Sequence, residues 1–66
     1  MRVKVDKDSD TLYFRLDESV IIDSEEIQPG VILDYNAQNQ VVGVEFLHIS
    51  TRASSNELSS IQFQTA

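Results

Sequence analysis

The segment from residue 25 to residue 46, "EEIQPGVILDYNAQNQVVGVEF", decides the fold. It holds the only proline of the chain, both glycines and the densest run of β-branched residues. Two apolar runs, "VILDYN" (residues 31–36) and "QVVGVEF" (residues 40–46), flank a polar stretch. This pattern predicts a β-hairpin whose type I turn ends in a left-handed residue, Asn39.

The register of this hairpin follows if Asn36 faces Gln40, which places Asp34 opposite Val42. One face is then expected to carry Ile32, Asp34, Val42, Val44 and Phe46, and the other to carry Val31, Leu33, Tyr35, Val41, Gly43, Glu45 and Leu47. Both faces are therefore predicted to be largely apolar. Either the C-terminal segment or a second subunit is expected to cover the second face.

The N-terminal half alternates in short runs. Residues 2–6, "RVKVD", and residues 11–17, "TLYFRLD", each have a period of two and predict a hairpin around an Asp/Ser-rich turn. Residues 20–28, "VIIDSEEIQ", lose strict alternation and predict an edge strand that is bulged near residues 23–25. Proline and glycine at residues 29–30 then end this strand.

The C-terminal part is polar and rich in serine. Residues 48–53 predict one short helical turn, and "SSIQFQT" (residues 59–65) alternates again, which favours a final strand over a C-terminal helix. The sequence therefore predicts one domain over residues 1–66 that is mainly β, with α+β as the alternative. We expect a single antiparallel meander sheet of five or six short strands and a short helical segment near residues 48–53.

Composition limits the classes of partner. A chain of 66 residues needs support beyond its own core, such as disulfides, a metal or oligomerisation. It has no cysteine and one histidine, which leaves oligomerisation, and we expect a homodimer. A net charge of −6 disfavours nucleic acid and anionic membranes and favours a basic protein partner. The apolar runs are far shorter than a membrane span and no signal-peptide pattern opens the chain, so a cytoplasmic protein is expected.

Four aspartates have the spacing of a calcium-binding loop. Asp6, Asp8, Asp10 and Asp17 stand at its first, third, fifth and twelfth positions, and Asp6, Asp8 and Asp10 are the metal-ligand candidates. The sixth position, however, is Thr11 instead of glycine, and the last ligand is Asp instead of Glu. A polar turn, in which the aspartates accept hydrogen bonds from nearby backbone amides, is the favoured interpretation, and no cofactor is predicted.

Asp34, Glu45 and Arg52 are the candidates for binding. Asp34 is predicted on an apolar face, where a carboxylate needs a partner, and Arg15 and Arg52 are the candidates for that partner. In the predicted register Asp34 and Glu45 point to opposite faces, which disfavours them as an acid–base pair unless a bulge intervenes. Gly43, within a strand, predicts a bulge or the close approach of another side chain, such as an aromatic ring.

His48 and Ser50 supply two residue types of a nucleophilic triad. The chain lacks the nucleophile elbow and the oxyanion-hole loop that such a triad needs, so no catalytic residue is assigned. His48 is instead expected to end the fifth strand or to cap the segment that follows.

Two segments carry a family resemblance: "DKDSDTLYFRL" and "SEEIQPGVILDYNAQNQVVGVEFLHISTR". Their pattern, D-x3-D-x-L-Y-x-x-L, an acidic segment, G-V-I-L-D-Y-[DN], a polar turn, V-G-[IV]-E-[IF]-L and S-x-R, resembles the DUF2283 family of small bacterial proteins. The resemblance covers residues 3–52 and leaves residues 53–66 as an extension. Its recurrent positions correspond here to Asp6, Asp10, Leu12, Tyr13, Gly30, Asp34, Gly43, Glu45 and Arg52. Asn36 and Asn39 depart from it, because Asp and Gly are common there.

The expected function is a non-enzymatic protein–protein interaction module. The acidic charge and the lack of a catalytic constellation favour it, and the resemblance implies an antitoxin-like role, because some relatives are encoded beside small toxin-like proteins. The alternative is a small-ligand or metal-dependent enzyme whose site is shared across a dimer, because 66 residues can barely form a pocket alone.

Overall fold

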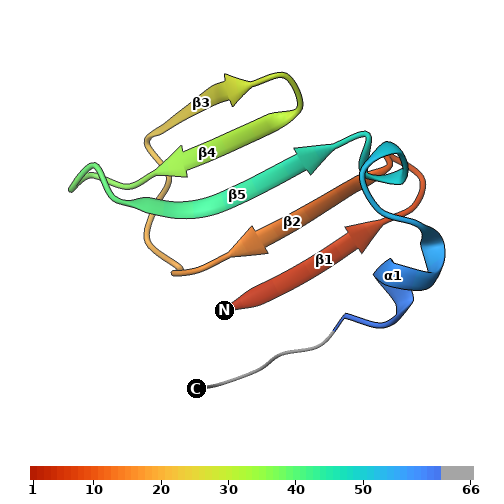
Figure 1. Cartoon of the computed structure of the whole chain (residues 1–66). Helices are drawn as coiled ribbons and strands as arrows, with labels where there is room; N and C mark the ends of the chain where they lie inside the picture. The colour runs from red at the N-terminus through yellow and green to blue at the C-terminus, as the bar shows by residue number, and fades with distance from the viewer. Residues whose placement is uncertain (62–66) are drawn as a thin grey trace, which may run out of the picture.

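The computed structural model describes residues 1–61 and is mainly β (Figure 1). The elements are β1 (Arg2–Asp6), β2 (Thr11–Arg15), β3 (Asp23–Gln28), β4 (Val31–Tyr35), β5 (Val41–Leu47), a 3-10 turn η1 (Ile49–Thr51) and a short helix α1 (Ser55–Ser59). The five strands form one antiparallel sheet. The predicted fold class, a single antiparallel sheet of short strands with a short helical segment, is therefore confirmed.

The sheet has the strand order β1-β2-β5-β4-β3. Strands adjacent in sequence are also neighbours in the sheet, except that the chain crosses from β2 to the far edge, where β3 begins. β3, β4 and β5 then return strand by strand, so that β5 pairs with β2 and lies at the centre (Figure 1). β5 has seven residues and is the longest strand, as suits the strand that joins the two halves of the sheet.

The turn between β4 and β5 forms as predicted. The amide of Asn36 donates to the carbonyl of Gln40, and Asn39 has a φ of 61°. Asn36 is buried and fixes the turn, because its Oδ1 accepts hydrogen bonds from the amides of Gln38 and Gln40, each at 3.0 Å. Asparagine tolerates the left-handed conformation better than most residues, which explains its place at residue 39.

The register beyond this turn differs from the prediction by one residue. Tyr35 pairs with Val41 but Asp34 pairs with Gly43, so Val42 is an extra residue that forms a β-bulge. The predicted pairing of Asp34 with Val42 is therefore wrong. A shift of one residue moves every later side chain of one strand to the other face relative to its partner.

Because of the bulge, the hairpin has one apolar face and one polar face. The prediction that both faces are largely apolar is therefore wrong. The apolar face carries Val3, Val5, Leu12, Phe14, Val31, Leu33, Val44 and Phe46 from four neighbouring strands. The polar face carries Lys4, Tyr13, Arg15, Ser24, Asp34 and Glu45, with Ile32 among them. This division is the ordinary one for an antiparallel sheet, because only one face has to be covered.

β3 is an edge strand in which every residue is exposed. It begins at Asp23, later than the predicted start at residue 20. Its pairing with β4 is irregular between Glu26 and Gln28, so the predicted bulge occurs at Ile27 and not near residues 23–25. An edge strand that is short, charged and bulged resists uncontrolled pairing with other chains.

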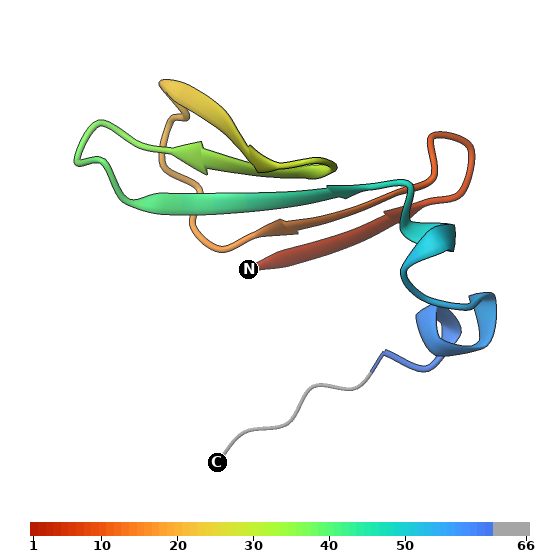
Figure 2. The ribbon, with the colours of Figure 1, turned by 45° about the horizontal axis from the view of Figure 1, so that its top comes forward.

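After β5, two short helical elements lie at one end of the sheet (Figure 2). The predicted helical turn near residues 48–53 is confirmed as η1, and α1 follows it. Ser54 caps α1, because its Oγ accepts a hydrogen bond from the amide of Glu57 at 3.2 Å. Ile61 belongs to no strand, and the rest of the predicted final strand, residues 62–65, lies outside the described residues. Among residues 1–61, no helix is long and apolar enough to span a membrane.

We predict that Asn39→Ala lowers the free energy of unfolding by about 1 kcal/mol, because alanine is strained at positive φ. Gln38→Ala, in the same turn but outside the left-handed region, is the matched control and should change stability by less than about 0.5 kcal/mol. Urea titration followed by circular dichroism measures both. Equal losses in the two variants would contradict this account of the turn.

Candidate functional site

Asp34 is the centre of a hydrogen-bonded polar cluster on the sheet. It is 9% exposed, and each carboxylate oxygen accepts one hydrogen bond. The hydroxyl of Tyr13 donates to Oδ2 at 3.0 Å, and the hydroxyl of Ser24 donates to Oδ1 at 2.6 Å. Because Tyr13 lies on β2, Ser24 on β3 and Asp34 on β4, three strands supply the cluster. We call Tyr13, Ser24 and Asp34, with Gly43 beneath them, the Asp34 cluster.

Gly43 makes room for this cluster. A Cβ atom at residue 43 would lie 2.6 Å from the hydroxyl of Tyr13 and 2.8 Å from Oδ2 of Asp34. Any other residue would therefore displace the tyrosine hydroxyl and the carboxylate oxygen from these positions. This confirms the prediction that glycine admits a neighbour here, and the neighbour is Tyr13.

Arg15 extends the cluster toward the crossover between β2 and β3. Its Nη1 donates to the hydroxyl of Tyr13 at 3.4 Å, its Nε donates to the carbonyl of Asp17 at 2.6 Å, and its Nη2 donates to the carbonyl of Ser19. The hydrogen bond with Tyr13 raises the pKa of Arg15 above its ordinary value. Arg15 thus reaches Asp34 only through Tyr13, and the predicted direct ion pair of Asp34 with an arginine is wrong.

Glu45 lies on the same face as Asp34, which corrects the expectation that they point to opposite faces. The bulge at Val42 places Glu45 between Tyr13 of β2 and Ile32 of β4. Glu45 and Tyr13 line a shallow depression of about 260 Å³ together with Lys4, Asp6, Ser9 and Thr11. Asp34 does not line it. The two carboxylates therefore share a face but not a cavity.

Arg52 lies at another place, beside the turn between β3 and β4. Its Nη2 donates to the carbonyl of Pro29 at 2.9 Å, and Gly30 lies directly below, with a φ of 81°. A Cβ at Gly30 would lie 3.2 Å from Nη2 of Arg52. Arg52 therefore fastens the end of η1 to this turn, and the three binding candidates Asp34, Glu45 and Arg52 do not converge.

The metal-ligand candidates serve the turn between β1 and β2. Oδ1 of Asp6 accepts hydrogen bonds from the amides of Asp8 and Ser9, at 3.0 and 3.2 Å, as the local-turn interpretation predicts. The bond from Ser9 holds the pKa of Asp6 below its ordinary value. Asp10 instead faces η1, where it accepts from the amide of Ser50 at 3.0 Å and from its hydroxyl at 2.7 Å. Within residues 1–61, no three histidine or carboxylate side chains form a group that could hold a metal ion.

His48 and Ser50 take structural positions. His48 follows β5 with a φ of 51° and precedes η1 as its N-terminal capping residue, as expected, although its side chain makes no capping hydrogen bond. The hydroxyl of Ser50 is engaged with Asp10. These contacts join the first turn of the chain to the segment that leaves the last strand.

Sequence reasoning missed Tyr13 and Ser24 as the partners of Asp34. The gap that Gly43 leaves in an otherwise β-branched strand was a usable signal for the approach of an aromatic residue. Ser24 had no such signal, because its pairing with Asp34 depends on the register of β3, where strict alternation is absent.

The family described as "Protein of unknown function (DUF2283)" matches residues 2–50. Among curated proteins and among solved structures, none matches the chain.

We predict that Gly43→Ala lowers the free energy of unfolding by about 2–3 kcal/mol, because the new methyl group overlaps Tyr13 and Asp34. Tyr13→Phe alone should cost about 1–2 kcal/mol through the lost hydrogen bond to Asp34. The loss of unfolding free energy in the double variant should be smaller, by at least about 1 kcal/mol, than the sum of the losses in the two single variants. The reason is that phenylalanine removes the closest overlapping atom. Chemical denaturation of the four chains completes the cycle, and strict additivity would contradict the proposed overlap.

Asp17 makes part of the stability dependent on pH. The hydroxyl and the amide of Ser19 donate to its carboxylate and hold its pKa below the ordinary 3.8. The ionised form therefore stabilises the folded chain at neutral pH, and this stabilisation is lost as pH falls below about 4 through the folded-state pKa.

We therefore predict that Asp17→Asn melts at a lower temperature than the wild type at about pH 7. Between about pH 5 and pH 2.5, the melting temperature of this variant should fall by less than that of the wild type. Ser19→Ala keeps the carboxylate but removes one donor, so its profile should lie between the two. Melting curves across this range measure the effect. Parallel profiles for all three chains would show that Asp17 does not contribute.

Proposed function

The chain belongs to the DUF2283 family, and we propose that it is a non-enzymatic protein-interaction module that holds a basic partner along the free edge of β3. The proposal rests on one observation, the exposure and the negative charge of β3. It is an edge strand in which all six residues are exposed, and three of them are carboxylates: Asp23, Glu25 and Glu26.

A free edge offers backbone groups to an incoming strand. One side of β3 pairs with β4, and the other carries amides and carbonyls that face no neighbouring strand in the described part of the chain. An extended segment of another protein can add to such an edge, where main-chain hydrogen bonds give affinity and side chains give specificity. The carboxylates point to both sides of the strand, so a partner segment with lysine or arginine meets charge on either side.

Exposed apolar side chains border the same edge. Ile22, just before β3, is 64% exposed, and Ile27, at the bulge, is 50% exposed. Ile22 continues the pairing, because its amide donates to the carbonyl of Tyr35 at 2.9 Å. A partner that is basic and partly apolar would complement both features. A basic toxin-like protein is one partner of this kind, and the antitoxin-like role implied by the resemblance is one form of this proposal.

The enzymatic alternative has weaker support. Both oxygens of Asp34 already accept hydrogen bonds from Tyr13 and Ser24, which suits a structural carboxylate. Glu45 and Arg52 line different depressions. A general acid or base needs a free proton path to a bound substrate, and these side chains do not share a cavity that would hold one.

The test is affinity capture from the native host with charge-matched baits. The edge variant Asp23→Lys/Glu25→Lys raises the net charge by four, and the control Asp8→Lys/Glu57→Lys raises it equally outside β3. We expect the wild type and the control to retain the same basic protein, the edge variant to lose it, and about 0.5 M salt to release it. Retention by all three baits, or by none, would contradict the proposal.

A further inference from the structure

Among the described residues, 1–61, no second layer covers most of the apolar face of the sheet. Four neighbouring strands, β1, β2, β5 and β4, supply its eight side chains, and Phe14 and Phe46 contact edge to face at a centroid distance of 6.3 Å. Of these eight side chains Val31 is the one that is buried, at 5% exposure, and Val42, which precedes Val44 on the same side of β5, is also buried, at 3%. The other seven members retain intermediate exposure to solvent.

The described chain lacks a closed core. In residues 1–61 the buried hydrophobic side chains are Val31, Val42 and Ile49, and none of them is fully enclosed. A single sheet must bury its apolar face against a second layer to be stable. Disulfides are excluded because the chain has no cysteine.

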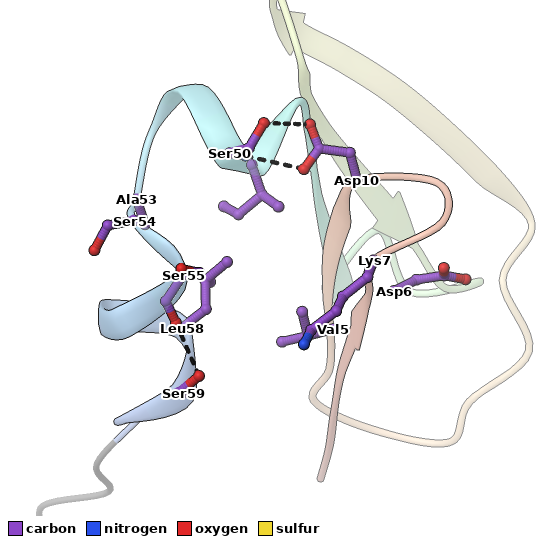
Figure 3. Close-up of a pocket in the computed structure, with 11 residues that line it drawn as sticks. Val5, Asp6, Lys7, Asp10, Ser50, Ala53, Ser54, Ser55, Leu58 and Ser59 are labelled. Carbon is purple, nitrogen blue, oxygen red and sulfur yellow. Dashed lines mark hydrogen bonds between the residues drawn. The ribbon is translucent and has the colours of Figure 1, made fainter.

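Within residues 1–61, the chain supplies only part of this second layer. η1 and α1 lie at one end of the sheet, where Val5 and Leu58 face each other across a groove of about 520 Å³ (Figures 2 and 3). Ile49 and Ala53 also line the groove. The groove is continuous with the apolar face through Val5, so an occupant of the face also reaches the groove.

We propose that a second copy of this chain covers the apolar face, so that two sheets stack into a β-sandwich. The eight side chains of the face include no charged residue, and the nearest carboxylates on that side, Asp23 and Glu25, lie at the rim on β3. An uncharged apolar face packs favourably against another uncharged apolar face. A second copy of the chain presents such a face. Stacked sheets of this kind lie about 10 Å apart with their strands within about 30° of each other.

Charge also selects the arrangement. On the apolar side, the edge strand β3 carries Asp23 and Glu25, whereas the opposite edge strand, β1, carries Val3 and Val5 and no carboxylate. A two-fold axis parallel to the strands places the β1 edge of one copy over the acidic edge of the other and so keeps the rim carboxylates of the two copies apart. A two-fold axis that lies in the interface but runs perpendicular to the strands would instead place the acidic edges of the two copies over each other.

Dimerisation through sheet edges is the competing arrangement, and charge opposes it. Pairing β3 with β3 of a second copy would place its carboxylates side by side, which is unfavourable between adjacent strands. Pairing β1 with β3 joins unlike surfaces and so generates an open chain of subunits instead of a closed dimer. Face-to-face stacking closes with two copies and leaves β3 free, so this inference holds independently of any basic partner.

Neighbouring residues of β4 provide a matched test. Leu33 lies on the apolar face and Ile32 on the polar face, and both have intermediate exposure. Gel filtration with light scattering at about 100 μM, a concentration suited to a modest interface, should give a mass near twice 7.5 kDa for the wild type and for Ile32→Lys. Leu33→Lys should give a monomer. A monomeric wild type, or a dimer lost in Ile32→Lys but kept in Leu33→Lys, would overturn the proposal.

A second measurement decides the matter if Leu33→Lys fails to fold. Because the chain has no cysteine, Val44→Cys places a single thiol on the apolar face of β5, the central strand. A short bifunctional maleimide should link two copies of Val44→Cys and should not link Ile32→Cys, whose thiol lies on the opposite face. Equal crosslinking of the two variants, or none in either, would contradict face-to-face stacking.

Discussion

The hydroxyl of Tyr13 and the carboxylate of Asp34 meet above the bare Cα of Gly43, and the arrangement of the sheet depends on this contact. Gly43 lies on the central strand, and its two neighbours across the ladder are β2 and β4. Ser24 adds β3 to the same cluster. A polar contact between strands far apart in sequence defines one register, because a slip of one residue would bring a valine in place of the glycine.

The same contact explains what the sequence could and could not predict. Local signals determine the hairpin turn, the left-handed Asn39 and the helical turn after His48, and all of these were predicted. Gly43 is a local signal for a bulge or a close neighbour, but nothing local identifies Val42 as the extra residue, since Val41 and Val42 are chemically alike. Only the binary pattern of the whole sheet favours it, because the bulge places the apolar side chains on one face. The partners of Asp34 depend on that register and were missed with it.

Most of the residues that carry the family resemblance make contacts that stabilise the fold. Asp6 closes the first turn, Asp10 fixes η1, and Gly30 and Arg52 form the turn between β3 and β4. Tyr13, Asp34 and Gly43 form the cluster described above, and Leu12 belongs to the apolar face. A sequence pattern built from such residues specifies a scaffold. β3 enters this pattern as an acidic segment, and none of the recurrent single positions lies on it.

The crossover between β2 and β3 has a consequence for how the chain folds. It divides the sequence into two units, the β1–β2 hairpin and the β3–β4–β5 meander, whose strand pairs are local and form rapidly. The pairing of β2 with β5 joins the two units and requires closure of a loop of about 30 residues. We therefore expect the joining step to limit the rate of folding. Arg15, which donates to the carbonyls of Asp17 and Ser19, orders the first residues of that loop in the finished sheet.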